Sequence, residues 1–145
     1  MIDPAPTTQI DPRLARGLLL ERGTEVASKP DHIVFGTHNN NYQLHLKPTE
    51  PVDTEVGKKL IGTVRVDARK IDRVHTGGRF IEPVYGRPRR VQGTVVAITD
   101  ETVVVDAGIK IHLRPTERDQ QPSDFKLGEL VGCDVHAGAT FTPAS

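Results

Sequence analysis

The heptad LHLKPTE at residues 44–50 recurs as IHLRPTE at residues 111–117, and this repetition is the main sequence evidence on the fold. In both copies apolar residues alternate with polar ones and a proline follows, a pattern typical of a strand with one buried face. The heptads therefore predict equivalent β-strands that end at Pro48 and Pro115. Because His45 and His112 alternate with apolar residues, we expect both on the outer face of a sheet rather than in a metal or catalytic site.

Three further blocks repeat in the same order around the heptads. Residues 22–36 align with residues 92–106 at a shift of 70, and LIG at 60–62 aligns with LVG at 130–132 at the same shift. Phe80 and Pro83 then pair with Phe141 and Pro143. We interpret the chain as a tandem duplication, with a flexible N-terminal tail at residues 1–15 and two units at residues 16–85 and 86–145.

The second unit shows its strands most clearly. Residues 91–99 and 102–108 form two β-rich runs around a turn at Asp100 and Glu101, and residues 109–115, 129–135 and 139–143 supply three more. Five strands with the longer connection after the third are typical of a small Greek-key barrel that binds oligonucleotides or oligosaccharides. The expected fold class is all-β, with two tandem five-stranded barrels of this type. Residues 14–23 could instead form a short helix behind Asp11 and Pro12, but the repeat favours a strand.

The stretches GTVVAITDETVVVDAG at 93–108 and FKLGELVGCDV at 125–135 carry a resemblance. Their order is similar to the RNA-binding repeat of the largest small-subunit ribosomal protein, a member of the oligonucleotide/oligosaccharide-binding barrel fold. The resemblance implies this barrel and RNA binding. Members of the family carry exposed aromatic residues on the second and third strands, where this chain has Val104, Lys110 and His112.

The first unit has extra residues at 63–83, TVRVDARKIDRVHTGGRFIEP. A Gly-Gly pair supplies the positive φ values of tight turns, so we expect a long hairpin that turns at Gly77 and Gly78. In a barrel of this type the hairpin would be a loop used to hold oligonucleotides.

Charge is strongly segregated, although the net charge is zero. Residues 58–90 hold 10 basic and 3 acidic side chains, whereas residues 1–57 hold 5 and 8 and residues 91–145 hold 4 and 8. This basic stripe predicts contact with phosphates. The candidate nucleic-acid-binding residues are Arg65, Arg69, Lys70, Arg73, Arg79, Arg87, Arg89 and Arg90.

The stripe has other interpretations. Asp67, Asp72 and Glu82 could pair with its arginines across the hairpin, or the acidic parts of a neighbouring molecule could attract it. Two functions therefore stay open: a single-stranded RNA- or DNA-binding protein, and a protein-interaction or self-assembly module. Charge segregation favours the first, and the scarcity of aromatic residues for base stacking favours the second. A carbohydrate- or metabolite-binding barrel is a third, weaker possibility.

Catalytic, metal-binding and targeting signals are not found in the sequence. It contains no phosphate-binding glycine loop, nucleophile elbow or HExxH motif, so we expect no enzyme, no cofactor and no metal. The single Cys133 excludes an intramolecular disulfide and is expected to be a small buried residue. No stretch is typical of a signal peptide or membrane span, so we expect a cytoplasmic protein without a membrane partner.

Overall fold

The computed structural model describes residues 11–23, 32–37 and 42–144. Most of the predicted tail, the aligned segment at 24–31 and the loop at 38–41 lie outside the described residues. Within these ranges, no helix is long and apolar enough to cross a membrane.

Twelve β-strands make up the described part of the chain, which confirms the all-β class. They are β1 (Ala15–Arg22), β2 (Ile33–Gly36), β3 (Gln43–Pro48), β4 (Lys59–Ala68), β5 (Asp72–Arg73), β6 (Phe80–Glu82), β7 (Tyr85–Gly86), β8 (Arg90–Ile98), β9 (Val103–Asp106), β10 (Lys110–Pro115), β11 (Leu130–Asp134) and β12 (Thr140–Pro143). A short 3-10 turn, η1 (Pro122–Asp124), precedes β11.

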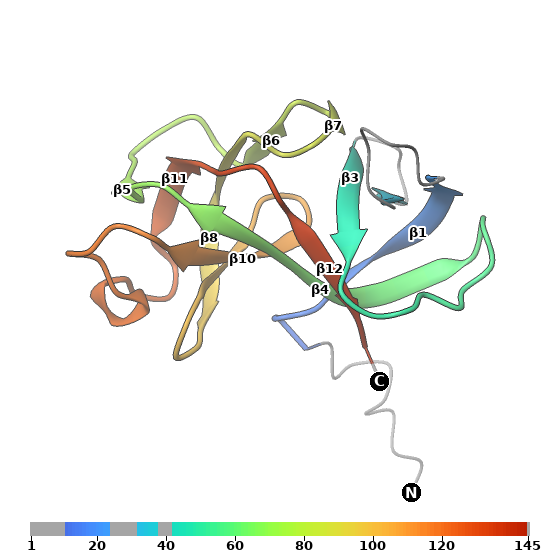
Figure 1. Cartoon of the computed structure of the whole chain (residues 1–145). Coiled ribbons are helices and arrows are strands. Elements are labelled where there is room, and N and C mark those ends of the chain that lie inside the picture. Colours follow the sequence, from blue (N-terminus) through green and yellow to red (C-terminus); the bar gives the residue numbers. More distant parts are fainter. Residues whose placement is uncertain (1–10, 24–31, 38–41, 145) are drawn as a thin grey trace, which may run out of the picture.

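Five of the strands close into a barrel in the order β1, β2, β3, β12 and β4, with β4 pairing back onto β1 (Figure 1). β12 runs parallel to β3 and antiparallel to β4, so the barrel is mixed. Phe35 of β2 and Phe141 of β12 are fully buried, with ring centroids 5.6 Å apart. This aromatic contact fastens the C-terminal strand to the N-terminal part of the chain.

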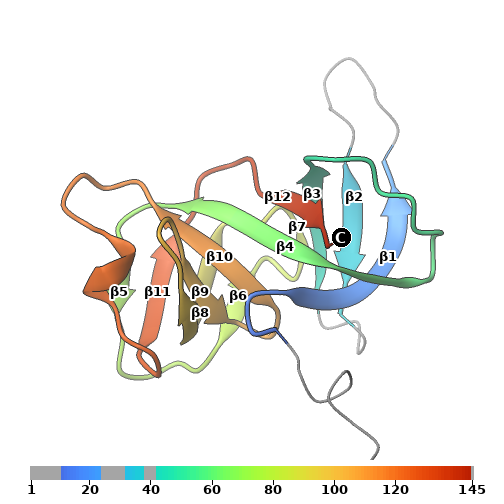
Figure 2. The ribbon, with the colours of Figure 1, turned by 90° about the horizontal axis from the view of Figure 1, so that it is seen from below.

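The other seven strands are peripheral: β7 pairs with β3, and β4 connects the other six to the barrel through β10 (Figure 2). The N-terminal part of β4 pairs with β1, whereas from Val64 to Ala68 it pairs in parallel with β10. β9, β8, β11 and β5 then follow β10 across the sheet. β6 adds to β8, and β7 adds to β3 of the barrel.

The barrel takes strands from both ends of the sequence. This differs from our expectation that residues 16–85 would supply all the strands of one barrel, because β12 belongs to the predicted second unit. Any two strands can form backbone hydrogen bonds, so an inventory of strands does not specify their partners. The structure shows one closed barrel, and a second barrel and the duplication stay predictions.

The predicted positions of individual strands and turns agree with the structure better than the predicted strand pairing does. β8 to β12 match the five strands expected in residues 91–143, and β1 shows that residues 15–22 form a strand rather than a helix. The turn at Asp100 and Glu101 is confirmed, since the Thr99 amide donates a hydrogen bond to the Thr102 carbonyl at 2.9 Å. These features depend on short-range patterns of apolar and turn-forming residues.

The predicted hairpin at 63–83 is wrong. Gly77 and Gly78 do have positive φ values, 102° and 64°. The strands around them nevertheless pair elsewhere, β4 with β10, β5 with β11 and β6 with β8. The physical reason lies in β4, where Val64, Val66 and Ala68 are buried. A projecting hairpin would leave these apolar side chains in water, whereas pairing with β10 buries them.

The last residues of the predicted tail belong to the fold. Ala15 begins β1 and is fully buried. The Arg13 carbonyl oxygen lies 2.8 Å from His112 Nε2. This contact helps to bury His112, which is only 8% exposed, so the expected outer-face position is wrong for this histidine. His45 is half-buried on β3.

Candidate functional site

The eight candidate cations divide into two groups. Four pair with carboxylates: Arg65 with Glu101 at 2.9 Å, Arg73 with Glu129 at 2.7 Å, Arg79 with Asp106 at 2.8 Å and Arg90 with Asp134 at 3.1 Å. All four carboxylates belong to residues 91–145, and none comes from the segment at 63–83 where the sequence suggested partners. The basic stripe is therefore partly neutralised by the acidic end of the same chain.

Arg73 has the most contacts of the paired group. Besides its ion pair with Glu129, its guanidinium donates a hydrogen bond to the Asp124 carbonyl and lies 4.8 Å from the centroid of the Phe125 ring. The hydrogen bond from Arg73 holds the pKa of Glu129 below its usual value. Arg73 thus connects β5 to the segment before β11, which is a structural role.

The other four cations are Arg69, Lys70, Arg87 and Arg89. They are exposed, and none forms an ion pair with another residue that the structure describes. The Arg69 amide donates to the Asp134 carbonyl at 2.9 Å, and the Val135 amide donates to the Arg89 carbonyl at 2.8 Å. The end of β11 therefore lies between the two segments that carry the unpaired cations.

Charges alternate across the strands at this place. Ala68 bridges Val135, which puts Arg69 opposite Asp134. Asp134 lies opposite Arg90, and Arg90 lies opposite Glu82. Directly opposed side chains of antiparallel strands share a face, and opposite charges there stabilise the sheet. Arg69 and Arg90 thus have acidic neighbours, and Lys70, Arg87 and Arg89 are the least compensated.

A groove of about 560 Å³ opens beside this row. Its lining residues are Ile81, Glu82, Pro83, Val84, Arg89, Arg90 and Asp134. Val84 is 61% exposed, so the groove has an apolar border as well as two arginines. The charge of the lining is balanced, because the carboxylates of Glu82 and Asp134 lie beside the two arginines.

Tyr85 is a residue that the sequence reasoning missed. It is 55% exposed in the connection between β6 and β8, residues 83–89, which also holds Arg87 and Arg89. Its ring lies edge-on to His45 at 4.8 Å, and His45 stacks on His32 at 5.0 Å. The available signal was the apolar pair Val84 and Tyr85 inside a polar, proline-containing stretch.

A second groove, of about 570 Å³, has His112 in its lining. Because a carbonyl only accepts, His112 Nε2 donates to Arg13, and its Nδ1 accepts from the Thr102 hydroxyl at 2.9 Å. Burial lowers the pKa of His112, which favours the neutral ring. The four charged residues of this groove form two ion pairs, Arg13 with Asp11 and Arg65 with Glu101. We therefore assign this groove a structural role.

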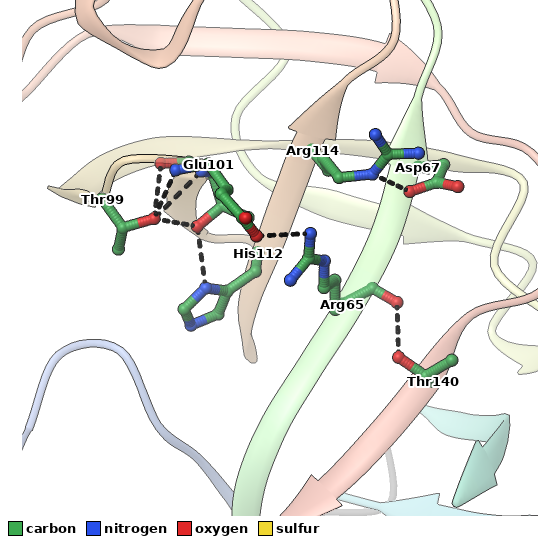
Figure 3. Close-up of polar contacts among 8 residues, drawn as sticks. Arg65, Asp67, Thr99, Glu101, His112, Arg114 and Thr140 are labelled. Carbon is green, nitrogen blue, oxygen red and sulfur yellow. Dashed lines mark hydrogen bonds and ion pairs between the residues drawn. The ribbon is translucent and has the colours of Figure 1, made fainter. Parts of the chain in front are cut away.

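The ion pair between Asp67 and Arg114 joins two parallel strands beside that groove (Figure 3). The two residues are directly opposed in the register of β4 and β10, and Arg114 Nε donates to Asp67 Oδ1 at 2.7 Å. This hydrogen bond lowers the pKa of Asp67 and raises that of Arg114. Asp67 is thus engaged with β10 and not with the basic stripe.

Cys133 is 1% exposed, which confirms the buried position expected for it. Burial raises the pKa of its thiol to about 12, so the reactive thiolate is disfavoured. Among the described residues, no three His, Cys, Asp or Glu side chains are grouped so that they could hold a metal ion.

Comparison of the chain with protein-family models, with curated proteins and with solved structures gave no match.

Proposed function

We propose that this chain is a non-enzymatic protein that binds single-stranded RNA or DNA, with Arg69, Lys70, Arg87 and Arg89 as its phosphate contacts. One observation carries the proposal: these four exposed cations lack ion-pair partners among the described residues, and their two segments flank the end of β11. A five-stranded barrel with binding loops is a common framework for oligonucleotides, which supports a single-stranded ligand.

Cations without an ion-pair partner should contribute most to the affinity for nucleic acid. A free guanidinium or ammonium that meets a phosphate releases a counterion, and this release drives much of the affinity. A cation already paired to a carboxylate must first give up that contact, which is worth about 0–1 kcal/mol at an exposed site. Arg65, Arg73, Arg79 and Arg90 therefore contribute less than the sequence suggested.

The test is a titration of labelled single-stranded RNA and DNA at several salt concentrations. Four phosphate contacts would give a slope of log affinity against log salt near −2.8, from roughly −0.7 per contact. The double substitution Arg87→Ser with Arg89→Ser should reduce that slope by about half. The matched double substitution Arg65→Ser with Arg79→Ser removes the same charge from paired positions and should change the slope little.

Two results would refute the proposal. One is an absence of wild-type binding at micromolar protein in low salt. The other is an equal effect of the two double substitutions, because net charge alone would then explain the binding and the surface around β11 would have no special part.

A second candidate function is a protein-interaction or self-assembly module. The exposed apolar side chains of Val84 and Leu127 favour it, since they are 61% and 67% exposed and would gain from burial in an interface. Sedimentation over a range of concentrations tests this function. Self-association that is lost on Val84→Ser, together with no oligonucleotide binding, would support it over the first.

The duplication and the oligonucleotide-binding type of the barrel are part of the same proposal. In each predicted unit the third strand pairs in parallel with a strand from the other unit, β3 with β12 and β10 with β4. The hairpins β1–β2 and β8–β9 also share an irregularity in register, at Leu19/Glu21 and at Val95/Ala97. These shared features support an ancestral unit of which each copy supplies one strand that pairs with the third strand of the other copy.

A further inference from the structure

We infer that Tyr85 is a stacking site for an unpaired nucleobase, which makes this surface selective for single strands over duplexes. The inference rests on the proposed function and adds the group that recognises the base. Of the six Phe and Tyr residues in the chain, Tyr85 is the exposed one. Phe35, Phe125 and Phe141 are buried, and the remaining two are half-buried.

The backbone holds Tyr85 in place. β7 pairs in parallel with β3, with Tyr85 next to Gln43, and the Gln43 amide donates to the Val84 carbonyl at 2.7 Å. The ring also contacts His45 edge-on at 4.8 Å, with 74° between the ring planes. An exposed aromatic ring that is already fixed loses little conformational freedom when a ligand stacks on it.

The cations stand close by in sequence. Gly86, with φ of 116°, follows Tyr85 and turns the chain, and Arg87 and Arg89 come directly afterwards, both exposed. Sequence-tolerant binding of single strands combines aromatic rings that stack on bases with cations that follow the phosphates. The connection at 83–89 therefore carries both groups within seven residues.

Duplex nucleic acid would not use this site in the same way. Its bases are stacked on each other inside the helix, so Tyr85 could contact only the backbone or a terminal base. Phosphate contacts by Arg87 and Arg89 would remain, because they do not need an unpaired base. Selectivity for single strands thus depends on Tyr85, whereas salt dependence comes from the cations.

The experiment compares Tyr85→Leu, which removes the aromatic face, with Tyr85→Phe, which keeps it. Each full-length protein is titrated with a single-stranded oligonucleotide, with an abasic strand of equal length and with a duplex. We expect Tyr85→Leu to weaken single-strand binding roughly 5- to 150-fold, the range for one stacked base. Its salt slope and its affinity for the abasic strand should match those of the wild type, and Tyr85→Phe should bind like the wild type.

Urea unfolding of each variant serves as the control for folding, since Tyr85 is exposed and its pairing with β3 uses the backbone. If the wild type binds single strands and Tyr85→Leu binds them equally well, the stacking inference is wrong and the proposed function stands. If the wild type binds no oligonucleotide in low salt, both are wrong. An equal loss of affinity for the abasic strand would also overturn the inference, because the ring would then act without a base.

Discussion

Replacing Gly62 by alanine should test whether the C-terminal strand closes the barrel. Gly62 lies in β4 and pairs with Pro143 of β12. A Cβ added at this position would lie 2.3 Å from the Thr142 carbonyl oxygen and 2.5 Å from Phe141 Cζ. Both atoms belong to β12, so the substitution places a methyl group directly against that strand.

The structure sets the size of the effect. Carbon atoms that are not bonded lie about 3.5 Å apart. The added Cβ would lie 2.5 Å from Phe141 Cζ, so β12 would have to move by about 1 Å. Overpacking of this kind costs about 1–3 kcal/mol, and each backbone hydrogen bond lost between β4 and β12 adds about 1 kcal/mol. Alanine loses less backbone entropy than glycine when a strand folds, which adds about 0.5–1 kcal/mol to the free energy of unfolding. We expect a net loss of about 2–3 kcal/mol in the free energy of unfolding.

The matched control is Gly132→Ala, at the position that the repeat aligns with Gly62. There the nearest atom to an added Cβ is Gln92 Oε1 at 2.9 Å, on a buried side chain whose Nε2 donates hydrogen bonds to the Thr76 and Gly78 carbonyls. Because one side chain and no backbone atom has to shift, this variant should lose less in the free energy of unfolding than Gly62→Ala, about 1 kcal/mol. Equilibrium urea unfolding, followed by far-ultraviolet circular dichroism, measures both variants.

Hydrogen exchange adds the location of the effect. The Ala144 amide, which donates to the Ile61 carbonyl at 2.9 Å, should exchange faster in Gly62→Ala than in Gly132→Ala. Equal stability of the two variants, or a loss below about 0.5 kcal/mol for Gly62→Ala, would show that β12 does not pack against β4 as described.

Three further predictions concern titratable groups. Burial lowers the pKa of His112 below its ordinary value of 6.5, so its contribution to stability is complete above that value and is lost as the pH falls through the folded pKa. The free energy of unfolding in urea should therefore decline below pH 6.5 in the wild type, and this decline should be absent in His112→Gln. An identical decline in both proteins would contradict a buried, neutral His112. The Cys133 thiol, with a pKa raised to about 12, should react with a thiol reagent far more slowly in the folded protein than in urea, whereas equally fast labelling would show that the site is open. Asp67→Asn should cost no more than about 1 kcal/mol at neutral pH, because the pair with Arg114 is half-exposed. Its difference from the wild type should vanish as the pH falls from 3.8 through the lowered pKa of Asp67, and a constant difference would argue against the ion pair.

Strands and turns that depend on neighbouring residues could be predicted from the sequence alone. The alternation around Leu113 predicts β10, Pro115 marks its end, and the turn at Asp100 and Glu101 separates β8 from β9. These features arise because a strand shows its buried face every second residue, and because turns favour particular residues at particular positions. The buried position of Cys133 was expected for another reason, because free thiols are among the most buried side chains.

Which strands pair with each other depends on the packing of the whole chain and could not be predicted from the sequence. The sequence predicts strands within residues 63–83 and at residues 139–143. It does not specify their partners, because any two strands can form backbone hydrogen bonds. β4 and β12 therefore meet strands of the other predicted unit where their apolar faces are best buried. The same long-range packing brings residues 11–14 to His112 and the carboxylates of residues 91–145 to four arginines of the basic stripe. It also fixes Tyr85 beside β3, next to His45, which is 40 positions earlier in the sequence. Contacts between distant parts of the chain depend on how the whole core packs, and a periodic pattern in one segment does not contain that information.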